Sequence, residues 1–225
     1  MTYPLEILDL EKSYNDKIAV NKISFKVNKN EVVGILGPNG CGKTTTIGMI
    51  LGLLKPSYGK VLINGHEIEK KRVNLLGQLN FISPYIELPK KLTVKQNLEV
   101  YARLYDVKNL NEKIDYLSEK LKLKNMLNKI TGELSSGQKN RVSLAKSIIN
   151  DPSVLLLDEP TASLDPETGD YIRGFLEEYQ NEKKASIVIA SHNMLEVERL
   201  CSSVLMMNSG VIIDSGKPKD LIKKH

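Results

Sequence analysis

The feature that most constrains this 225-residue chain is a glycine-rich segment between an apolar run and a helix-forming run. Residues 37–44 read Gly-Pro-Asn-Gly-Cys-Gly-Lys-Thr, which fits the pattern G-x-x-x-x-G-K-[ST]. Val32–Leu36 before it is apolar at nearly every position, as in a strand covered on both faces. A helix is predicted from Thr44 to about Leu53, ahead of Pro56. This strand, loop and helix order favours a phosphate-binding loop over an ordinary glycine turn.

The chemistry of such a loop is that of anion binding. Its glycines let successive backbone N–H groups point into one concavity, and the helix N-terminus adds positive potential. Lys43 is expected to supply charge to the outer phosphates, and Thr44 a hydroxyl to Mg²⁺. Cys41 falls at a variable position, so no catalytic role is assigned to its thiol. The predicted nucleotide-binding residues of the loop are Gly37, Pro38, Asn39, Gly40, Cys41, Gly42, Lys43, Thr44 and Thr45.

Two carboxylates and a histidine follow apolar runs later in the chain. Asp158 and Glu159 come directly after Val154–Leu157, and His192 comes shortly after Ser186–Ala190. Because parallel strands present their carboxyl ends at one edge of a sheet, we expect these side chains near the phosphate loop. Asp158 is the predicted magnesium partner, and Glu159 the predicted base that polarises an attacking water. Taken alone, the acids also fit a solvated strand exit, and a lone histidine there is more often structural.

Short β-branched runs alternate with helical stretches, which predicts an α/β fold with a mostly parallel sheet. The predicted strands are Leu5–Leu8, Ile23–Val27, Val32–Leu36, Val61–Ile63, Leu79–Ile82, Val154–Leu157, Ser186–Ala190, Val204–Met207 and Val211–Asp214. The predicted helices after the first are Thr93–Tyr105, Asn111–Leu123, Ser135–Ile149, Pro166–Glu182 and Asn193–Cys201. We interpret residues 1–225 as one domain, with a core of 1–84 and 151–225 and an inserted helical lobe of 85–150. In the helix at 135–149, Val142, Ala145 and Ile148 form the expected buried stripe, and Lys146 is expected off it.

Composition excludes several classes of protein. Apolar residues make up 41% of the chain and charged residues 26%, which excludes disordered and collagen-like chains. No apolar run approaches the ~18 residues of a membrane-spanning helix. The stretch from Met1 to Tyr14 carries acidic residues where a signal peptide would carry basic ones, so we expect a cytoplasmic protein. Cys41 and Cys201 lack metal-ligand spacing, which is typical of a reducing compartment.

The net charge of +5 is carried mainly by lysines spread along the chain. A nucleic-acid-binding protein more often concentrates basic residues and interleaves aromatics, so no nucleic-acid partner is expected. An anionic membrane surface remains compatible with this charge.

A short polar segment between the loop and the acid pair decides the family resemblance. Leu134-Ser135-Ser136-Gly137-Gln138 could by itself be a helix N-cap. Its place 22 residues before Asp158, counted from Ser136, makes it resemble the signature sequence, normally LSGGQ, of the ATP-binding cassette (ABC) family. The resemblance covers about Leu5 to Leu221. It implies a P-loop NTPase core with an N-terminal antiparallel β region and an inserted helical lobe.

The resemblance also implies roles for individual residues. Gly37–Thr45 is similar to the family's Walker A loop, and Val154–Glu159 to its Walker B strand, with Glu159 as the catalytic carboxylate. His192 resembles the switch histidine. Asp165, in Ser163-Leu164-Asp165, resembles the D-loop aspartate. Tyr14 is similar in position to the aromatic that stacks on adenine, although a half-buried tyrosine at a strand end is the alternative.

By the same resemblance, the active form is a head-to-tail dimer with two ATP molecules between its subunits. The signature residues of one subunit are then expected to contact the ATP held by the other subunit's loop, which leaves a lone subunit a poor hydrolase. The expected ligands are ATP and Mg²⁺, and the expected partners are a second ABC subunit, identical or different, and integral membrane subunits. The signature residues concerned are Ser135, Ser136, Gly137 and Gln138.

The sequence departs from the family pattern at two points. Ser136 stands where glycine is usual, but Ser135 and Gly137 are kept, so we expect function to survive. The glutamine of the family's Q-loop should fall at about Pro84, and the nearest glutamine, Gln78, precedes the strand Leu79–Ile82. This difference leaves the second protein ligand of the metal unassigned.

These observations predict the nucleotide-binding and hydrolysing subunit of an ABC transporter, peripheral on the cytoplasmic face of the cell membrane. The single short cassette resembles exporter subunits more than sugar importers. The stretch Phe81–Thr93 is the expected surface for a helix of the membrane subunit, with loop packing as the alternative. A non-transport ABC ATPase acting on DNA or ribosomes is the second candidate, although this chain has no CxxC motif and one cassette.

Overall fold

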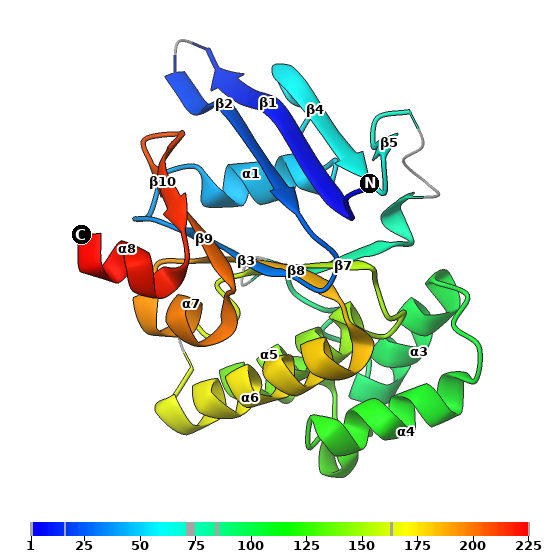
Figure 1. Ribbon diagram of the computed structural model, residues 1–225. Coiled ribbons are helices and arrows are strands. Elements are labelled where there is room, and N and C mark those ends of the chain that lie inside the picture. Colours follow the sequence, from blue (N-terminus) through cyan, green and yellow to red (C-terminus); the bar gives the residue numbers. More distant parts are fainter. Residues whose placement is uncertain (1, 16, 71–74, 84–85, 163, 225) are drawn as a thin grey trace.

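The computed structural model describes residues 2–15, 17–70, 75–83, 86–162 and 164–224, which form two sheets and a layer of helices. Figure 1 shows the smaller sheet above helix α1, the larger sheet in the middle, and α3 to α7 beneath it. The smaller sheet is antiparallel, in the order β2-β1-β4-β5. Its strands are β1 (Leu5–Tyr14), β2 (Lys17–Val27), β4 (Tyr58–Ile63) and β5 (His66–Glu67).

The larger sheet carries the carboxyl edge on which the sequence places its polar residues. Its order is β10-β9-β3-β8-β7-β6, and all its neighbouring pairs are parallel except β9 with β10. The strands are β3 (Val32–Leu36), β6 (Leu79–Ile82), β7 (Val154–Asp158), β8 (Ser186–Ser191), β9 (Ser203–Asn208) and β10 (Val211–Gly216). The predicted α/β class and mostly parallel sheet are therefore confirmed.

The strands at the centre of this sheet are covered on both faces, as the apolar run Val32–Leu36 predicts. Alternate residues of β7 belong to different hydrophobic clusters: Leu156 packs towards α1 and the smaller sheet, and Leu155 towards the lower helices. Helix α1 (Lys43–Ile50) fills the space between the sheets with Ile47 and Ile50 (Figure 1). The helix that follows the phosphate loop is thus buried between the two sheets.

The remaining helices pack below the larger sheet, and those between β6 and β7 come from the predicted lobe. Their buried residues belong to one cluster together with the lower face of the larger sheet. None of the helices among the described residues is long and apolar enough to cross a membrane. The helices are α3 (Val94–Leu104), α4 (Leu110–Lys120), α5 (Ser136–Ser147), α6 (Pro166–Lys183), α7 (Met194–Leu200) and α8 (Pro218–Lys224), with short 3₁₀ turns η1 (Lys124–Met126) and η2 (Thr131–Glu133).

Several predicted boundaries differ from the structure for physical reasons. Strands β1 and β2 are longer than predicted because one face of their sheet is exposed, so polar residues alternate with apolar ones. Helix α1 ends at Ile50 rather than Leu53, because the N–H groups of Leu53 and Leu54 turn back to the carbonyl of Gly48. Helix α8 was not predicted, and it begins at a proline, a residue that favours a first helical turn.

Lys146 is buried, contrary to its predicted place off the apolar stripe of α5. Its side chain is 8% exposed. Its Nζ donates hydrogen bonds to Asn80 Oδ1 at 3.1 Å and the Phe81 carbonyl at 3.4 Å. The same nitrogen lies 4.7 Å from the ring centre of Phe81 and 5.1 Å from that of Tyr101. The long side chain reaches β6 from the helix, and burial lowers the pKa of Lys146 from 10.5 to about 8.

This lowered pKa predicts a pH dependence of stability. Between pH 8 and pH 10.5 the unfolded chain binds the Lys146 proton more tightly than the folded chain, so raising the pH favours folding. We expect wild type to gain up to about 3 kcal/mol relative to Lys146→Met over this range. Denaturant unfolding at a series of pH values measures the difference. Lys108→Met, at an exposed position, is the control, and equal pH slopes in all three proteins would contradict the prediction.

Candidate functional site

The phosphate loop joins β3 to α1 and uses glycine where other residues do not fit. Gly42 is the N-cap of α1 and has φ of +109°, a conformation that side chains disfavour. A Cβ on Gly37 would lie 2.1 Å from the carbonyl oxygen of Met207. Cys41 is buried, and its carbonyl accepts from the N–H of Gly210, so the thiol lies outside the exposed part of the loop. Pro38, Asn39 and Gly40 form that exposed part.

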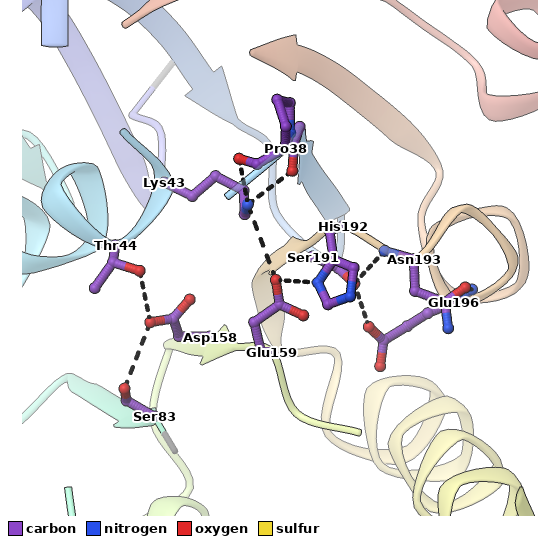
Figure 2. Close-up of polar contacts among 11 residues, drawn as sticks. Pro38, Lys43, Thr44, Ser83, Asp158, Glu159, Ser191, His192, Asn193 and Glu196 are labelled. Carbon is purple, nitrogen blue, oxygen red and sulfur yellow. Dashed lines mark hydrogen bonds and ion pairs between the residues drawn. The ribbon is translucent and has the colours of Figure 1, made fainter. Parts of the chain in front are cut away.

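Lys43 places its charge inside this loop. The side chain is 5% exposed, and its Nζ donates to the carbonyls of Gly37 at 2.7 Å and Pro38 at 3.2 Å. The same nitrogen lies 3.9 Å from Glu159 Oε1 (Figure 2). A cation among backbone N–H groups at a helix N-terminus attracts phosphate oxygens. The loop therefore has the arrangement that the sequence predicts for a phosphate site.

Asp158, the last residue of β7, meets Thr44 from α1. Its Oδ2 accepts from the Thr44 hydroxyl at 3.2 Å and from the Ser83 hydroxyl at 3.4 Å (Figure 2). Burial raises the pKa of Asp158. Among the described residues, Asp158 Oδ1 is buried without a hydrogen-bond partner. The free carboxylate oxygen and the adjacent hydroxyl are hard oxygen donors, which fit Mg²⁺ bound mainly by phosphate and water.

Ser83 is a contact that the sequence argument missed. It follows β6, whose carboxyl end lies beside that of β7, and this adjacency was the available signal. Gln78 lies at the opposite end of β6, where its Oε1 accepts from Asn64 Nδ2 at 2.6 Å. Gln78 is thus far along the strand from the acidic edge. The expected Q-loop position, Pro84, lies outside the described residues.

Glu159 and His192 form a hydrogen-bonded pair at the same edge. Glu159 has φ of +50°, which is a left-handed conformation. The strand ends at this point, so the Glu159 side chain no longer follows the alternation of side chains between the two faces of β7. Its Oε1 lies 2.8 Å from His192 Nδ1 (Figure 2). The Glu159 side chain is 14% exposed and that of His192 53%. A carboxylate held between an imidazole and Lys43 is suited to accept a proton from a nearby water.

Tyr14 lies at a cavity of about 440 Å³ beside the loop. Gly40, Gly42, Thr44 and Thr45 line the same cavity from the loop side. The tyrosine is 46% exposed, so its ring is accessible at the end of β1. The structure thus brings Tyr14 together with the loop, in a cavity large enough for a nucleotide base and sugar.

The signature segment begins α5, on the opposite side of the larger sheet from α1 (Figure 1). Ser135 is the N-cap: its Oγ accepts from the Gln138 N–H at 3.3 Å, and Gln138 Oε1 accepts from the Ser135 N–H at 3.0 Å. Ser135 and Ser136 are exposed, so the serine that departs from the usual glycine is accommodated at the surface of the described chain. Gly137 faces Thr168 of α6, where an added Cβ would lie 3.3 Å from the threonine methyl. None of the polar contacts of the described chain joins residues 135–138 to the phosphate loop.

Asp165 is the N-cap of α6. Its Oδ1 accepts from the Thr168 N–H at 2.9 Å, and this bond lowers the pKa of Asp165. Asp165 is exposed, and Ser163 of the predicted D-loop lies outside the described residues. The structure therefore shows a helix cap at this position.

This fold and site define an α/β nucleotide hydrolase with a phosphate-binding loop and an acidic strand end. A family model described as "ABC transporter" matches residues 20–162, and one described as "AAA domain, putative AbiEii toxin, Type IV TA system" matches residues 130–198. The chain belongs to the ABC transporter family. It is an ATP-binding and ATP-hydrolysing subunit of that family.

Curated relatives match nearly the whole chain. The Nod factor export ATP-binding protein I of Burkholderia orbicola (strain AU 1054) is 36% identical over 99% of this chain and 73% of that protein. The ABC transporter ATP-binding protein NatA of Bacillus subtilis (strain 168) is 34% identical over 98% of this chain and 92% of NatA.

Solved structures match the fold closely. An ATP-binding subunit of an ABC transporter has a TM-score of 0.88 at 28% identity, over 98% of this chain and 92% of that one. The cbiO1 protein of Clostridium perfringens, described as part of the ABC transporter complex cbiONQ, has a TM-score of 0.87 at 32% identity, over 100% of this chain and 92% of that one. The P-loop NTPase fold is thereby confirmed.

Proposed function

We propose that this chain is the ATP-driven subunit of a membrane exporter, which hydrolyses ATP as a dimer and passes the resulting motion to separate membrane subunits. It would then lie on the cytoplasmic face of the cell membrane. The observation that carries the hydrolytic part is the meeting of Lys43, Asp158, Glu159 and His192 at one edge of the larger sheet. The relatives named for Nod factor export support the direction of transport.

In this proposal each residue at the sheet edge has one task. Lys43 binds the outer phosphates of ATP, and Thr44 and Asp158 hold Mg²⁺, which neutralises phosphate charge when bound. Glu159 accepts the proton of the attacking water, and His192 holds Glu159 by the 2.8 Å contact. The ring of Tyr14 stacks on adenine at the neighbouring cavity. The other nucleotide contacts come from Gly37–Gly42 and Thr45.

The second copy completes the site. Ser135, Ser136, Gly137 and Gln138 of one subunit contact the ATP on the other subunit's loop, and Asp165 lies at the dimer surface. The exposure of Ser135 and Ser136 at the start of α5, and of Asp165 at the start of α6, supports this assignment. We also propose that residues 85–150 act as the helical subdomain that moves relative to the core of 1–84 and 151–225. Exposed Ile86 belongs to the stretch 81–93 that would contact the membrane subunit.

Copurification tests the transport assignment. The tagged full chain, extracted from its own cells in mild detergent, should bring down a protein with about six apolar segments of ~20 residues. Vesicles containing that complex should then show ATP-dependent movement of a substrate outward relative to the cytoplasmic face. Recovery of ribosomal or DNA-bound complexes without any membrane protein would support the second candidate and contradict the proposal.

The loop lysine gives a test of the nucleotide site. Lys43→Ala should weaken ATP binding at least tenfold, because the buried ammonium is the positive side chain within the loop. Equilibrium titration with ATP and Mg²⁺ measures the dissociation constant. Lys17→Ala, at an exposed lysine on the rim of the Tyr14 cavity, is the control for a general loss of positive charge and should weaken binding less. Unchanged affinity in Lys43→Ala would remove Lys43 from its proposed role.

A further inference from the structure

Glu196 is a buried carboxylate outside the chemistry described so far. It lies in the first turn of α7 and is 1% exposed. Neither the phosphate loop nor the magnesium position uses it. An ionised carboxylate in such a place is costly unless it is hydrogen-bonded, so its partners explain why the fold accepts it.

Each carboxylate oxygen of Glu196 bonds a different segment of the site, the turn after β7 and the last residue of β8. Oε1 accepts from the Thr161 hydroxyl at 2.7 Å, and Oε2 accepts from the Ser191 hydroxyl at 2.7 Å. Both distances are typical of well-formed O–H···O hydrogen bonds. Burial raises the pKa of Glu196, and the two hydroxyl donors oppose that change.

These two segments carry the hydrolytic pair. Thr161 stands two residues after Glu159, and Ser191 stands immediately before His192. Figure 2 shows Asn193 and Glu196 on the side of His192 away from Lys43. Ser191 Oγ also accepts from the Asn193 N–H at 3.0 Å, which fixes the chain directly after His192. One side chain thus connects the segments on which Glu159 and His192 depend.

The segment after Glu159 needs such support because its backbone leaves the strand in a disfavoured conformation. Glu159 has φ of +50°, which costs free energy in a residue with a side chain and persists where the surroundings enforce it. On one side, Asn140 Nδ2 of α5 donates to the Pro160 carbonyl at 2.8 Å. On the other side, Glu196 holds Thr161.

We propose that Glu196 is a positioning residue for ATP hydrolysis, which aligns Glu159 with His192 by bonding one oxygen to the segment next to each. The inference rests on the roles proposed for Glu159 and His192. It assigns Glu196 no contact with ATP or with the attacking water. A misplaced base lowers the rate of the chemical step while binding of ATP stays intact, and small displacements are known to have large effects on rate.

The sharpest test alters Thr161, which leaves the buried carboxylate bonded to Ser191. Thr161→Val keeps the shape but removes the hydroxyl, and we expect kcat of the full-length dimer to fall about tenfold. The ATP dissociation constant should change less than twofold. Thr161→Ser restores the hydroxyl and should recover most of the lost kcat. A loss in Thr161→Val that Thr161→Ser does not recover would overturn the proposal, as would wild-type kcat in Thr161→Val.

Glu196→Gln gives a second, independent arm. It keeps the size of the side chain but replaces one acceptor oxygen with an NH₂ donor, so one hydroxyl must turn to accept and its charge-assisted bond is weakened. Combined with Thr161→Val, it should give a smaller loss of kcat than the product of the two single losses, because both changes act on the same carboxylate bridge. Glu198→Gln makes the same substitution at an exposed position of α7 and should keep wild-type kcat. Multiplicative losses, or an equal loss in Glu198→Gln, would contradict the positioning role.

Glu159→Gln separates this inference from the assignment on which it rests. If Glu159→Gln abolishes turnover but Thr161→Val and Glu196→Gln keep wild-type kcat, only the positioning role fails. If Glu159→Gln itself keeps wild-type kcat, the proposed base is wrong and the role of Glu196 falls with it.

Discussion

Glu159→Gln is expected to bind ATP and dimerise but to turn over at least ~10²-fold more slowly than wild type, the scale of losing a general base. The amide keeps the size of the side chain but cannot accept the proton of an attacking water. Its oxygen can still face His192, so the local structure should persist. Phosphate release under saturating ATP measures turnover, and nucleotide titration measures binding.

The same substitution at another glutamate is the control. Glu167→Gln makes the same change at an exposed position in the first turn of α6 and should leave turnover near that of wild type. If Glu159→Gln hydrolyses ATP at a rate close to wild type, Glu159 is not the base. If it loses ATP affinity to the same extent as turnover, its role is in binding rather than in the chemical step.

Ser135→Arg is expected to reduce turnover by a similar factor without acting on its own chain's phosphate loop. Ser135 is exposed at the N-terminus of α5, and the described chain makes no polar contact between it and that loop. If the signature of one subunit completes the site of the other, the arginine blocks ATP contact in the second subunit. Because Ser135 also caps α5, a thermal melt must show that the variant stays folded.

Two kinds of heterodimer decide whether the sites are shared between subunits. When Lys43→Ala is on one subunit and Ser135→Arg on the other, one site combines both defects and the second carries neither. Such dimers, purified through two different tags, should regain up to about half of the wild-type turnover. When both substitutions are on one subunit and the other is wild type, each site carries one defect, and turnover should stay low. Equal activity in the two arrangements would contradict shared sites.

The phosphate site could be predicted in detail because its chemistry depends on residues that are close together in the sequence. Gly37–Thr44 specifies the loop by itself, and the apolar run Val32–Leu36 identifies the strand before it. The place of Asp158, Glu159 and His192 followed from one rule, that parallel strands present their carboxyl ends at the same edge. The structure brings all three to the loop, although their individual roles stay predictions.

Other contacts depend on distance in space and could not be predicted from local patterns. Lys146 lies off the apolar stripe of α5, yet it is buried because β6, far away in the sequence, supplies its partners. Glu196 looks like one of several acids on a short helix, and its partners come from the turn after β7 and from the end of β8. Helix α8 lacks the apolar periodicity of the longer helices, and two buried residues, Pro218 and Leu221, anchor it. Tertiary contacts decide each of these cases.

The most direct test of the central claim is a crystal structure of the full-length Glu159→Gln variant with ATP and Mg²⁺. The prediction is a dimer in which the phosphates of ATP occupy the loop of residues 37–44, with the metal between Thr44 and Asp158. Ser135 of the second subunit should contact the terminal phosphate. ATP bound elsewhere, or a terminal phosphate far from Asp158 and residue 159, would contradict the account.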